Sequence, residues 1–438
     1  MLNKIKRLFD LKLLKTTAAL TGGRAFHMMV SIVLMLIQSR YIEPETAGSV
    51  AYFFIPLGYL WILSLGIPSA LARELPFHLA KGEREQAVRL AKSTMTFSVI
   101  VGGLCSLGFV TASVRALVMG RNFNAVGWAV ASVGAFFTIY NLYILTTYRT
   151  TDEFVTVAKS NTVTAISNLA VFPLIFVNPY LGLFAKQTVT PVVQNIYLHI
   201  KRPFKLKFGM DHQDLWRLFK FGFPLIAITY FETGLWTSTQ SALIVTYLGT
   251  KNLGLYSFIN HMLLALLIIP HAVADILRPK FAAVYGQTNG SLRKTLAVAV
   301  KPLGLTLLVS LAAILFCRLV IGDIIAWLMP RYIDAIPAFN YALLLVPVNA
   351  LACIKYIFVV SKSTVYNAVS TISGFLVGIG LLYWGLKRGM EFKYVFVPYV
   401  IGRFTNFAMT VILLFIESVR RKKRKNEKKD HQVAGPVV

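Results

Sequence analysis

Residues 338–360 read AFNYALLLVPVNALACIKYIFVV, an apolar run interrupted by a single charged residue, Lys355. A bilayer has a hydrocarbon core about 30 Å thick, and an α-helix needs about 20 apolar residues to cross it. Inside the bilayer every backbone polar group must find a partner within its own segment, which favours a helix. The stretch therefore predicts a transmembrane helix that carries a buried positive charge.

Similar runs fill most of the chain. Of its 438 residues, 56% are hydrophobic and only 14% are charged, and the mean hydropathy is +0.64. These values are typical of a membrane protein and not of a soluble domain. We predict an all-α integral membrane protein with about twelve transmembrane helices. The predicted spans are 16–38, 47–69, 94–117, 125–147, 161–177, 181–198, 219–246, 253–276, 296–321, 338–360, 365–386 and 394–416.

Basic residues set the predicted orientation. Most of the 45 Lys and Arg residues fall in alternate loops, which the positive-inside rule assigns to the cytoplasm together with both termini. Because the +27 charge is spread over every inner loop and forms no single docking surface, a nucleic-acid partner is not expected, whereas membrane lipids are. The predicted regions are a cytoplasmic basic N-terminus (1–15), an N-terminal six-helix bundle (16–198), a cytoplasmic linker (199–218), a C-terminal six-helix bundle (219–416) and a basic cytoplasmic tail (417–438).

The sequence carries no motif for catalysis. It has no phosphate-cradling Gly-rich loop, no metal-ligand cluster and no convincing nucleophile motif. The three cysteines, Cys105, Cys317 and Cys353, fall within predicted spans and support neither a disulfide framework nor a zinc site. We expect a protein that is not an enzyme and that needs no cofactor or metal.

Among the basic residues inside the predicted spans we single out four: Arg24, Lys186, Lys355 and Arg403. A charge at the centre of a span costs at least about 2.5–3.5 kcal/mol, so such a residue usually faces a wet cavity or a partner. A guanidinium can bind a phosphate through two parallel hydrogen bonds. We predict that the four line a basic cleft for an anionic substrate. The alternative for each is a salt bridge within the membrane or a head group that reaches the interface.

Polar residues accompany the two arginines. His27, Ser31 and Gln38 follow Arg24 at spacings that place them near one helical face, and Asn406 continues the face of Arg403. We predict that these four polar residues line the same cavity.

Glu232 is the one carboxylate well inside a span. Buried carboxylates readily change protonation, so Glu232 is predicted either to pair with a basic residue or to bind an ion that couples transport.

A weak internal repeat links the two halves of the chain. Residues 40–48 read RYIEPETAG and residues 246–254 read TYLGTKNLG, so that Tyr41 and Gly48 recur as Tyr247 and Gly254 at the same spacing. Six predicted spans separate the copies, which means that both halves enter the membrane in the same sense. This predicts a pseudo-two-fold axis along the membrane normal, with two bundles and a central cleft.

Several short motifs between the spans resemble the bacterial polysaccharide (O-antigen-type) lipid-linked oligosaccharide flippases of the multidrug/oligosaccharidyl-lipid/polysaccharide (MOP) exporter superfamily. The resemblance covers about residues 15–416. Its motifs are Arg40-Tyr41 followed by Gly48, Ala72-Arg73-Glu74, Phe221-Gly222-Phe223-Pro224, Tyr247-Leu248-Gly249 with Gly254-Leu255-Tyr256-Ser257, and Ile336-Pro337-Ala338.

The resemblance implies a MATE-like pair of six-helix bundles in the bacterial cytoplasmic (inner) membrane. Such a protein moves an undecaprenyl-pyrophosphate-linked oligosaccharide between leaflets by alternating access, for cell-surface polysaccharide or lipopolysaccharide biosynthesis. A polysaccharide polymerase and assembly proteins are its implied partners. One alternative is a cation or drug antiporter of the same superfamily, which should present carboxylates to its cargo. Another is a membrane-embedded glycan polymerase or ligase, which would normally want a larger outer loop or a carboxylate site.

Overall fold

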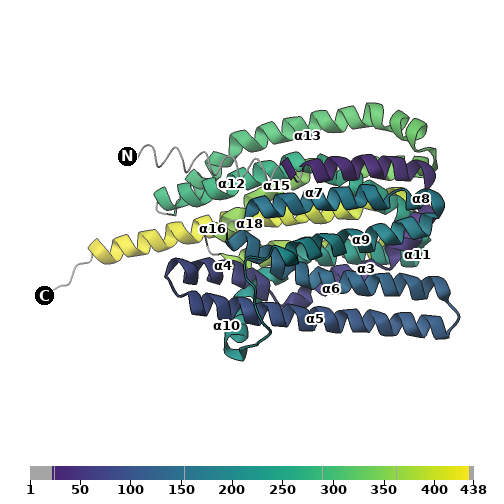
Figure 1. Ribbon diagram of the computed structural model, residues 1–438. Helices are drawn as coiled ribbons and strands as arrows, with labels where there is room; N and C mark the ends of the chain where they lie inside the picture. Colours follow the sequence, from purple (N-terminus) through teal and green to yellow (C-terminus); the bar gives the residue numbers. More distant parts are fainter. Residues whose placement is uncertain (1–21, 24, 152, 289, 362, 434–438) are drawn as a thin grey trace. The chain divides into compact units, whose positions relative to one another are not determined.

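The structure is a computed structural model that describes residues 22–433 except 24, 152, 289 and 362 (Figure 1). Every regular element in these residues is a helix, which confirms the all-α prediction. The chain divides into two compact units, Met1–Phe258 with Leu328–Tyr332, and Ile259–Trp327 with Ile333–Val438. The bundle boundaries given above stay a prediction.

The first unit is organised around a long helical hairpin, α5 (Arg84–Val118) and α6 (Asn122–Thr150). Gly120 takes a left-handed φ of +71° in the turn between them, a conformation open to glycine because it has no Cβ. Two apolar clusters form the core of this unit. The other elements are the helix Ala25–Tyr41, α2 (Pro44–Tyr52), α3 (Ile55–Leu60), η1 (Trp61–Ser64), α4 (Ile67–Ala80), α7 (Phe154–Val171), α8 (Leu174–Val177), α9 (Pro179–Ile200), α10 (His212–Glu232) and α11 (Gly234–Leu266), of which α11 belongs to this unit as far as Phe258.

The second unit contains a close helix pair, α17 (Thr364–Lys387) and α18 (Phe396–Val433). Gly374 permits their approach, because a Cβ there would lie 2.6 Å from the carbonyl oxygen of Gly402. Leu277, Phe281 and Phe358 are among the buried core residues. The remaining elements are α12 (Ile268–Gln287), α13 (Leu292–Leu328), η2 (Pro330–Ala335, shared with the first unit), α14 (Ile336–Ala342), α15 (Leu345–Ala352), η3 (Cys353–Lys355), α16 (Tyr356–Val360) and η4 (Phe392–Tyr394).

Fewer helices meet a length-and-hydropathy criterion for a span than the twelve predicted. Among the described residues eight do, or nine if the bent pair His212–Leu266 and Pro270–Gln287 counts as one. The first predicted span begins outside the described residues and leaves the shorter apolar helix Ala25–Tyr41. Span 181–198 forms α9, which is not among the eight. A multi-pass membrane protein is confirmed, and the cytoplasmic position of the termini stays a prediction.

Proline and glycine break several spans where their chemistry requires it. Span 47–69 becomes α2, α3, η1 and α4, with Pro56 in the first turn of α3 and Gly66 at φ +71° before α4. Span 161–177 is interrupted between α7 and α8 at Pro173. Proline has no N–H to donate and clashes with the preceding turn, so a helix commonly ends before it.

The two copies of the sequence repeat meet inside the first unit. A Cβ built on Gly48 of α2 would overlap the carbonyl oxygen of Thr250, and a Cβ built on Gly254 of α11 would overlap the carbonyl oxygen of Pro44. Pro44 and Thr250 hold equivalent places, each four residues before its glycine. A contact in which each copy presents the same surface to the other is isologous, as a two-fold axis requires. This geometry agrees with the sequence repeat. It also explains why both positions hold glycine, because a Cβ at either one would overlap the backbone of the other copy.

Candidate functional site

Lys186 of α9 is held by a residue of another helix. Its Nζ donates to Oε1 of Gln38, on the helix Ala25–Tyr41, at 3.2 Å. The lysine side chain is partly buried. In the part of the chain that the structure describes, no carboxylate lies within salt-bridge distance of Lys186. A positive charge therefore remains uncompensated within this helix pair, which favours an anion as its partner.

The helix Ala25–Tyr41 carries three of the predicted polar residues. Gln38 is the hydrogen-bond partner of Lys186. His27, Ser31 and Gln38 are all partly buried. The structure thus joins Gln38 to Lys186. Arg24, predicted to head this stripe, lies outside the described residues.

Arg403 occupies a buried position on α18 in the second unit. The residue as a whole is only 9% exposed. Nη2 donates to the hydroxyl of Tyr399 at 3.2 Å, and the guanidinium carbon lies 5.3 Å from the centroid of the Tyr399 ring. A cation over an aromatic face is stabilised by the ring quadrupole. Tyr399 therefore orients Arg403 along its own helix.

Asn406 lies one turn after Arg403 on α18 and is buried against α17. A Cβ on Gly374 would lie 2.8 Å from the Cβ of Asn406, which shows how closely the two helices approach. Asn406 is 5% exposed, and no described group donates a hydrogen bond to its Oδ1.

Lys355 closes η3, a short element that contacts α18. The residue is 5% exposed, so its ammonium does not lie at the surface of the second unit. The alternative in which Lys355 extends to the interface does not fit this burial. The structure thus places both Lys355 and Arg403 in the interior of one unit.

Glu232 is the last residue of α10, directly before a break inside a predicted span. Thr233 has φ −121° and ψ −75°, outside the helical region, and α11 starts at Gly234. The interruption exposes helix-terminal backbone groups at this depth, an arrangement that transporters tolerate only where protein or a water-filled cavity satisfies them.

A cavity of about 480 Å³ lies beside this break in the first unit. Its walls come from α2, α3, η1 and α11, and Gly58 lies against Ser238 where α3 crosses α11. Five hydroxyl groups and two aromatic rings line it: Thr233, Thr237, Ser238, Ser241 and Ser257, with Phe54 and Trp61. Hydroxyls both donate and accept hydrogen bonds, so the cavity is suited to a polar, hydroxylated ligand.

Sequence reasoning did not find this cavity or the role of Tyr399. The only signal for the break was Gly234, which the sequence marks as a possible bend beside the intramembrane carboxylate Glu232. The five hydroxyl residues all lie between Thr233 and Ser257, but the aromatic wall comes from the distant segment that holds Phe54 and Trp61, so no local spacing joins the two sides. Tyr399 is one turn before Arg403, and a search for polar neighbours toward the N-terminus would have identified it.

The polysaccharide biosynthesis protein family model matches residues 13–282, more than half of the chain. The chain belongs to this family. The broken spans and the intramembrane basic residues are therefore features of a polysaccharide biosynthesis protein. No curated protein matches the chain.

Solved structures show which fold this polysaccharide biosynthesis protein has. An inward-facing multidrug resistance MATE family transporter of the MOP superfamily is similar over 91% of this chain and 96% of its own, with a TM-score of 0.74 and 15% identity. The outward-facing form of a multidrug resistance MATE family transporter is similar over 93% of this chain and 96% of its own, with a TM-score of 0.65 and 16% identity. A MOP superfamily transporter from Pyrococcus furiosus, described by the reverse polarity of its binding pocket, is similar over 93% of this chain and 95% of its own. Its TM-score is 0.64 and its identity 15%.

These similarities confirm the MATE-like fold. The family model and the fold together describe a polysaccharide biosynthesis protein with the helical architecture of these transporters. They leave the cargo and the roles of individual residues open to proposal.

Proposed function

We propose that this protein is a flippase of the bacterial cytoplasmic membrane that translocates an undecaprenyl-pyrophosphate-linked oligosaccharide by alternating access. The observation that carries the proposal is Lys186, a partly buried ammonium that Gln38 positions without a neutralising carboxylate among the described residues. A pyrophosphate supplies the negative charge that this ammonium lacks, because lysine binds phosphate as a point charge.

The proposal assigns further residues of both units to substrate binding. In the second unit it assigns Arg403, held by Tyr399, and the buried Lys355, and in the first it adds Arg24 to Lys186. The hydroxyl-lined cavity beside Glu232 suits the glycan, since Ser and Thr side chains can exchange hydrogen bonds with sugar hydroxyls. Glu232 either pairs with a cation of the protein or binds a coupling ion.

A cation or drug antiporter is the competing function, because MATE family transporters share the fold. A cationic cargo requires carboxylates, whereas Lys186, Lys355 and Arg403 outnumber Glu232 inside the spans. The fold itself does not decide the polarity of the cargo, since one solved relative is described by a binding pocket of reverse polarity.

The decisive experiment is leaflet-resolved translocation of an undecaprenyl-pyrophosphate oligosaccharide in proteoliposomes. Lys186→Gln and Arg403→Gln are compared with the intact protein after equal insertion has been confirmed. A charge-assisted hydrogen bond contributes about 1.5–3 kcal/mol, so we expect each variant to slow translocation about tenfold or more. Lys159→Gln is the matched control, because Lys159 lies exposed on the neighbouring α7. This substitution removes the same positive charge as Lys186→Gln.

Two results contradict the proposal. One is efflux of an organic cation by the intact protein without translocation of lipid-linked oligosaccharides. The other is equal slowing by Lys159→Gln and Lys186→Gln, which would assign the effect to net charge and not to a binding position.

A further inference from the structure

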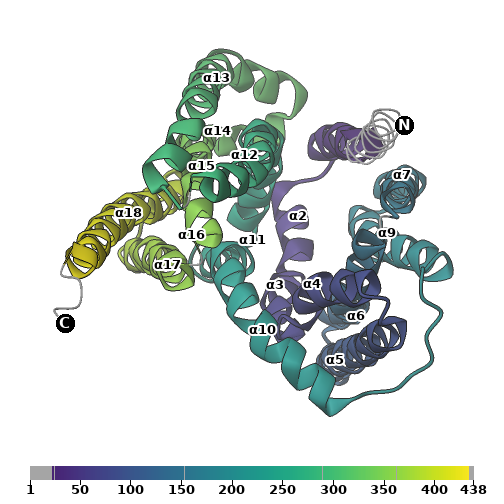
Figure 2. The same ribbon diagram turned by 90° about the vertical axis from the view of Figure 1, so that its left-hand side faces the viewer.

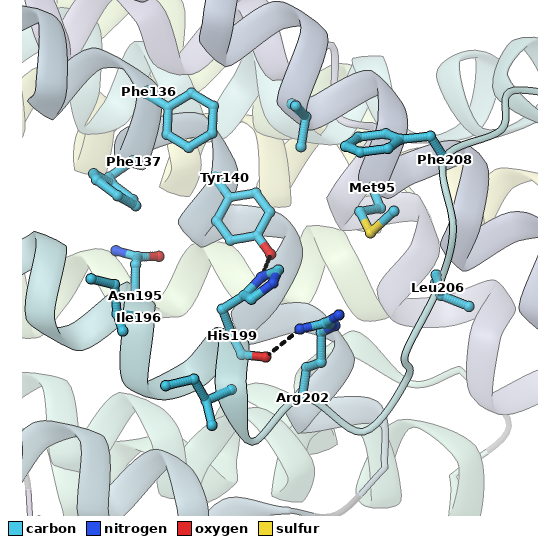
Figure 3. Close-up of a pocket in the computed structure, with 12 residues that line it drawn as sticks. Met95, Phe136, Phe137, Tyr140, Asn195, Ile196, His199, Arg202, Leu206 and Phe208 are labelled. Carbon is cyan, nitrogen blue, oxygen red and sulfur yellow. Dashed lines mark hydrogen bonds between the residues drawn. The ribbon is translucent and has the colours of Figure 1, made fainter.

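A second cavity of the first unit has a lining unlike that of the hydroxyl-lined cavity. Its volume is about 410 Å³, within the range of about 300–1,000 Å³ typical of ligand pockets. Helices α5, α6 and α9 form its walls with the segment 201–211, which we call the strap (Figure 3). Apolar side chains dominate the lining: Met95, Val99, Phe136, Phe137, Ile196, Ile200, Leu206 and Phe208.

The strap is an extended segment fixed to α5 by hydrogen bonds. Thr96 Oγ1 accepts from the amide of Gly209 and donates to its carbonyl, both at 3.0 Å. Ser93 Oγ accepts from the amide of Asp211, also at 3.0 Å. Figure 2 shows the strap passing around α5 between α9 and α10. These bonds hold the wall of the cavity in place, so the cavity is formed before any ligand arrives.

Side chains of the strap alternate between the helices and the surroundings. Phe204 and Leu206 pack on the apolar core of the unit, and Phe208 lines the cavity. Lys205 and Lys207 are exposed. Successive side chains of an extended segment point to opposite faces, so the strap offers an apolar face inward and a basic face outward.

One wall of the cavity carries polar groups, drawn in Figure 3. The hydroxyl of Tyr140 is 2.6 Å from Nδ1 of His199, and Nη1 of Arg202 donates to the carbonyl of His199 at 2.8 Å. No described acceptor serves Nε of Arg202, although this atom is buried. Nor does any described carboxylate form an ion pair with Arg202. The guanidinium therefore retains a donor and a full charge for a ligand.

Asn195 supplies an independent sign of a missing partner. It lines the cavity from α9, seven residues before Arg202 of the strap, and is only 1% exposed. Its Nδ2 donates to the carbonyl of Pro191 at 2.8 Å, while no group in the described chain donates to its buried Oδ1. Leaving a buried acceptor unsatisfied costs about 1–3 kcal/mol, so a ligand with a hydrogen-bond donor would be favoured there.

The mouth of the cavity faces apolar surroundings. Ile196, Ile200 and Phe208 are 51%, 64% and 68% exposed at its edge. In a membrane protein, exposed apolar side chains near a span end lie against lipid, so a chain can enter from the bilayer. The exposed lysines of the strap, Lys205 and Lys207, face outward and add a general attraction for an anionic membrane surface.

We propose that this cavity binds an anionic lipid, with its phosphate at Arg202, a head-group hydroxyl at Asn195 and an apolar chain between Met95, Phe136 and Phe208. A glycerophospholipid and a polyprenyl phosphate share this chemistry. Neither Lys186 nor Arg403 is among the residues that line this cavity.

The test is photocrosslinking of the intact protein in nanodiscs, with adducts mapped to peptides of α5, α6 and α9. Three probes carry a diazirine in the chain: phosphatidylglycerol, undecaprenyl phosphate and phosphatidylcholine. We expect one of the two anionic probes to label these peptides at least about tenfold more than phosphatidylcholine, and the better one identifies the source of the ligand. Arg202→Gln should lower this labelling about tenfold, because it removes a charge-assisted contact with phosphate.

Two further variants separate binding from folding. Lys205→Gln removes the same charge from the outer face of the strap and should change the labelling less than about threefold. Asn195→Leu keeps the approximate volume and removes the buried acceptor, so it should reduce labelling while the protein stays folded. Equal labelling by all three probes, or equal loss in Arg202→Gln and Lys205→Gln, would overturn the proposal. Undiminished labelling of Asn195→Leu would overturn the assignment of a head-group hydroxyl to Asn195.

Discussion

The reciprocal contact of Gly48 and Gly254 makes the sharpest prediction about the fold. In Gly48→Ala the new Cβ would lie 2.8 Å from the amide nitrogen of Gly254, besides overlapping the carbonyl oxygen of Thr250. Carbon atoms pack best at about 3.5–4.0 Å, so the helices must part by roughly 0.7 Å or more. The atoms in the way belong to the backbone and have no alternative rotamer. A gap of about this size loses roughly a quarter to a half of each dispersion contact across the crossing.

We therefore expect Gly48→Ala to cost about 1–3 kcal/mol, the range found when a packed site is overfilled. Gly254→Ala should cost a similar amount, because Pro44 stands in its way as Thr250 does for Gly48. The double variant should cost less than the sum, since one separation of the helices relieves both overlaps. Small residues at helix crossings matter in membranes, where packing replaces the hydrophobic drive between helices.

The assay is the thermal unfolding midpoint of the purified protein in detergent. Gly108→Ala is the matched control, because nothing lies within 4 Å of a Cβ on Gly108 in α5. Alanine favours a helix by about 0.5–1 kcal/mol over glycine, so the control should be neutral or stabilising. The reciprocal contact would be refuted if Gly48→Ala shifted the unfolding midpoint no more than Gly108→Ala does. It would also be refuted if the shifts of Gly48→Ala and Gly254→Ala differed strongly.

Three other predictions concern separate parts of the chain. Gly374→Ala should destabilise the second unit by about 1–3 kcal/mol, measured by the same unfolding midpoint, whereas Gly380→Ala on the same helix should not, because nothing lies within 4 Å of its Cβ. Asn178→Ala should cost about 0.5–2 kcal/mol, since Asn178 Oδ1 caps α9 by accepting from the amides of Tyr180 and Leu181 at 3.0 and 3.1 Å; Asn178→Asp, which keeps the acceptor, should restore the midpoint. Glu83 lies 2.5 Å from His78 Nδ1, and this hydrogen bond lowers the pKa of the Glu83 carboxyl. The ionised Glu83 carboxylate therefore contributes fully to stability above its unfolded pKa of about 4.3, and this contribution is lost as the pH falls through the lower folded pKa. Thermal unfolding midpoints measured from about pH 6 downward should therefore fall less in Glu83→Gln than in the intact protein.

Prediction from sequence succeeded where the signal is local. Apolar runs such as 338–360 identify membrane helices because hydropathy is a property of neighbouring residues. The continuity of the helices was not predicted for 47–69 and 219–246, where Gly66 and Thr233 leave the helical region and divide each run. The motif at Gly48 and Gly254 was recognised from spacing alone, and the structure supplies the close approach that excludes a Cβ there.

The sequence by itself determined the class of protein, an all-helical membrane protein with basic residues in its apolar runs, because transfer of side chains to lipid depends on residue type and order. Only the tertiary structure decided which distant residues meet. Lys186 finds Gln38, and Asn195 joins Arg202 and the strap around one cavity. These pairings depend on how helices pack and where backbones approach, and packing follows from shape in three dimensions, which no periodicity along the chain records.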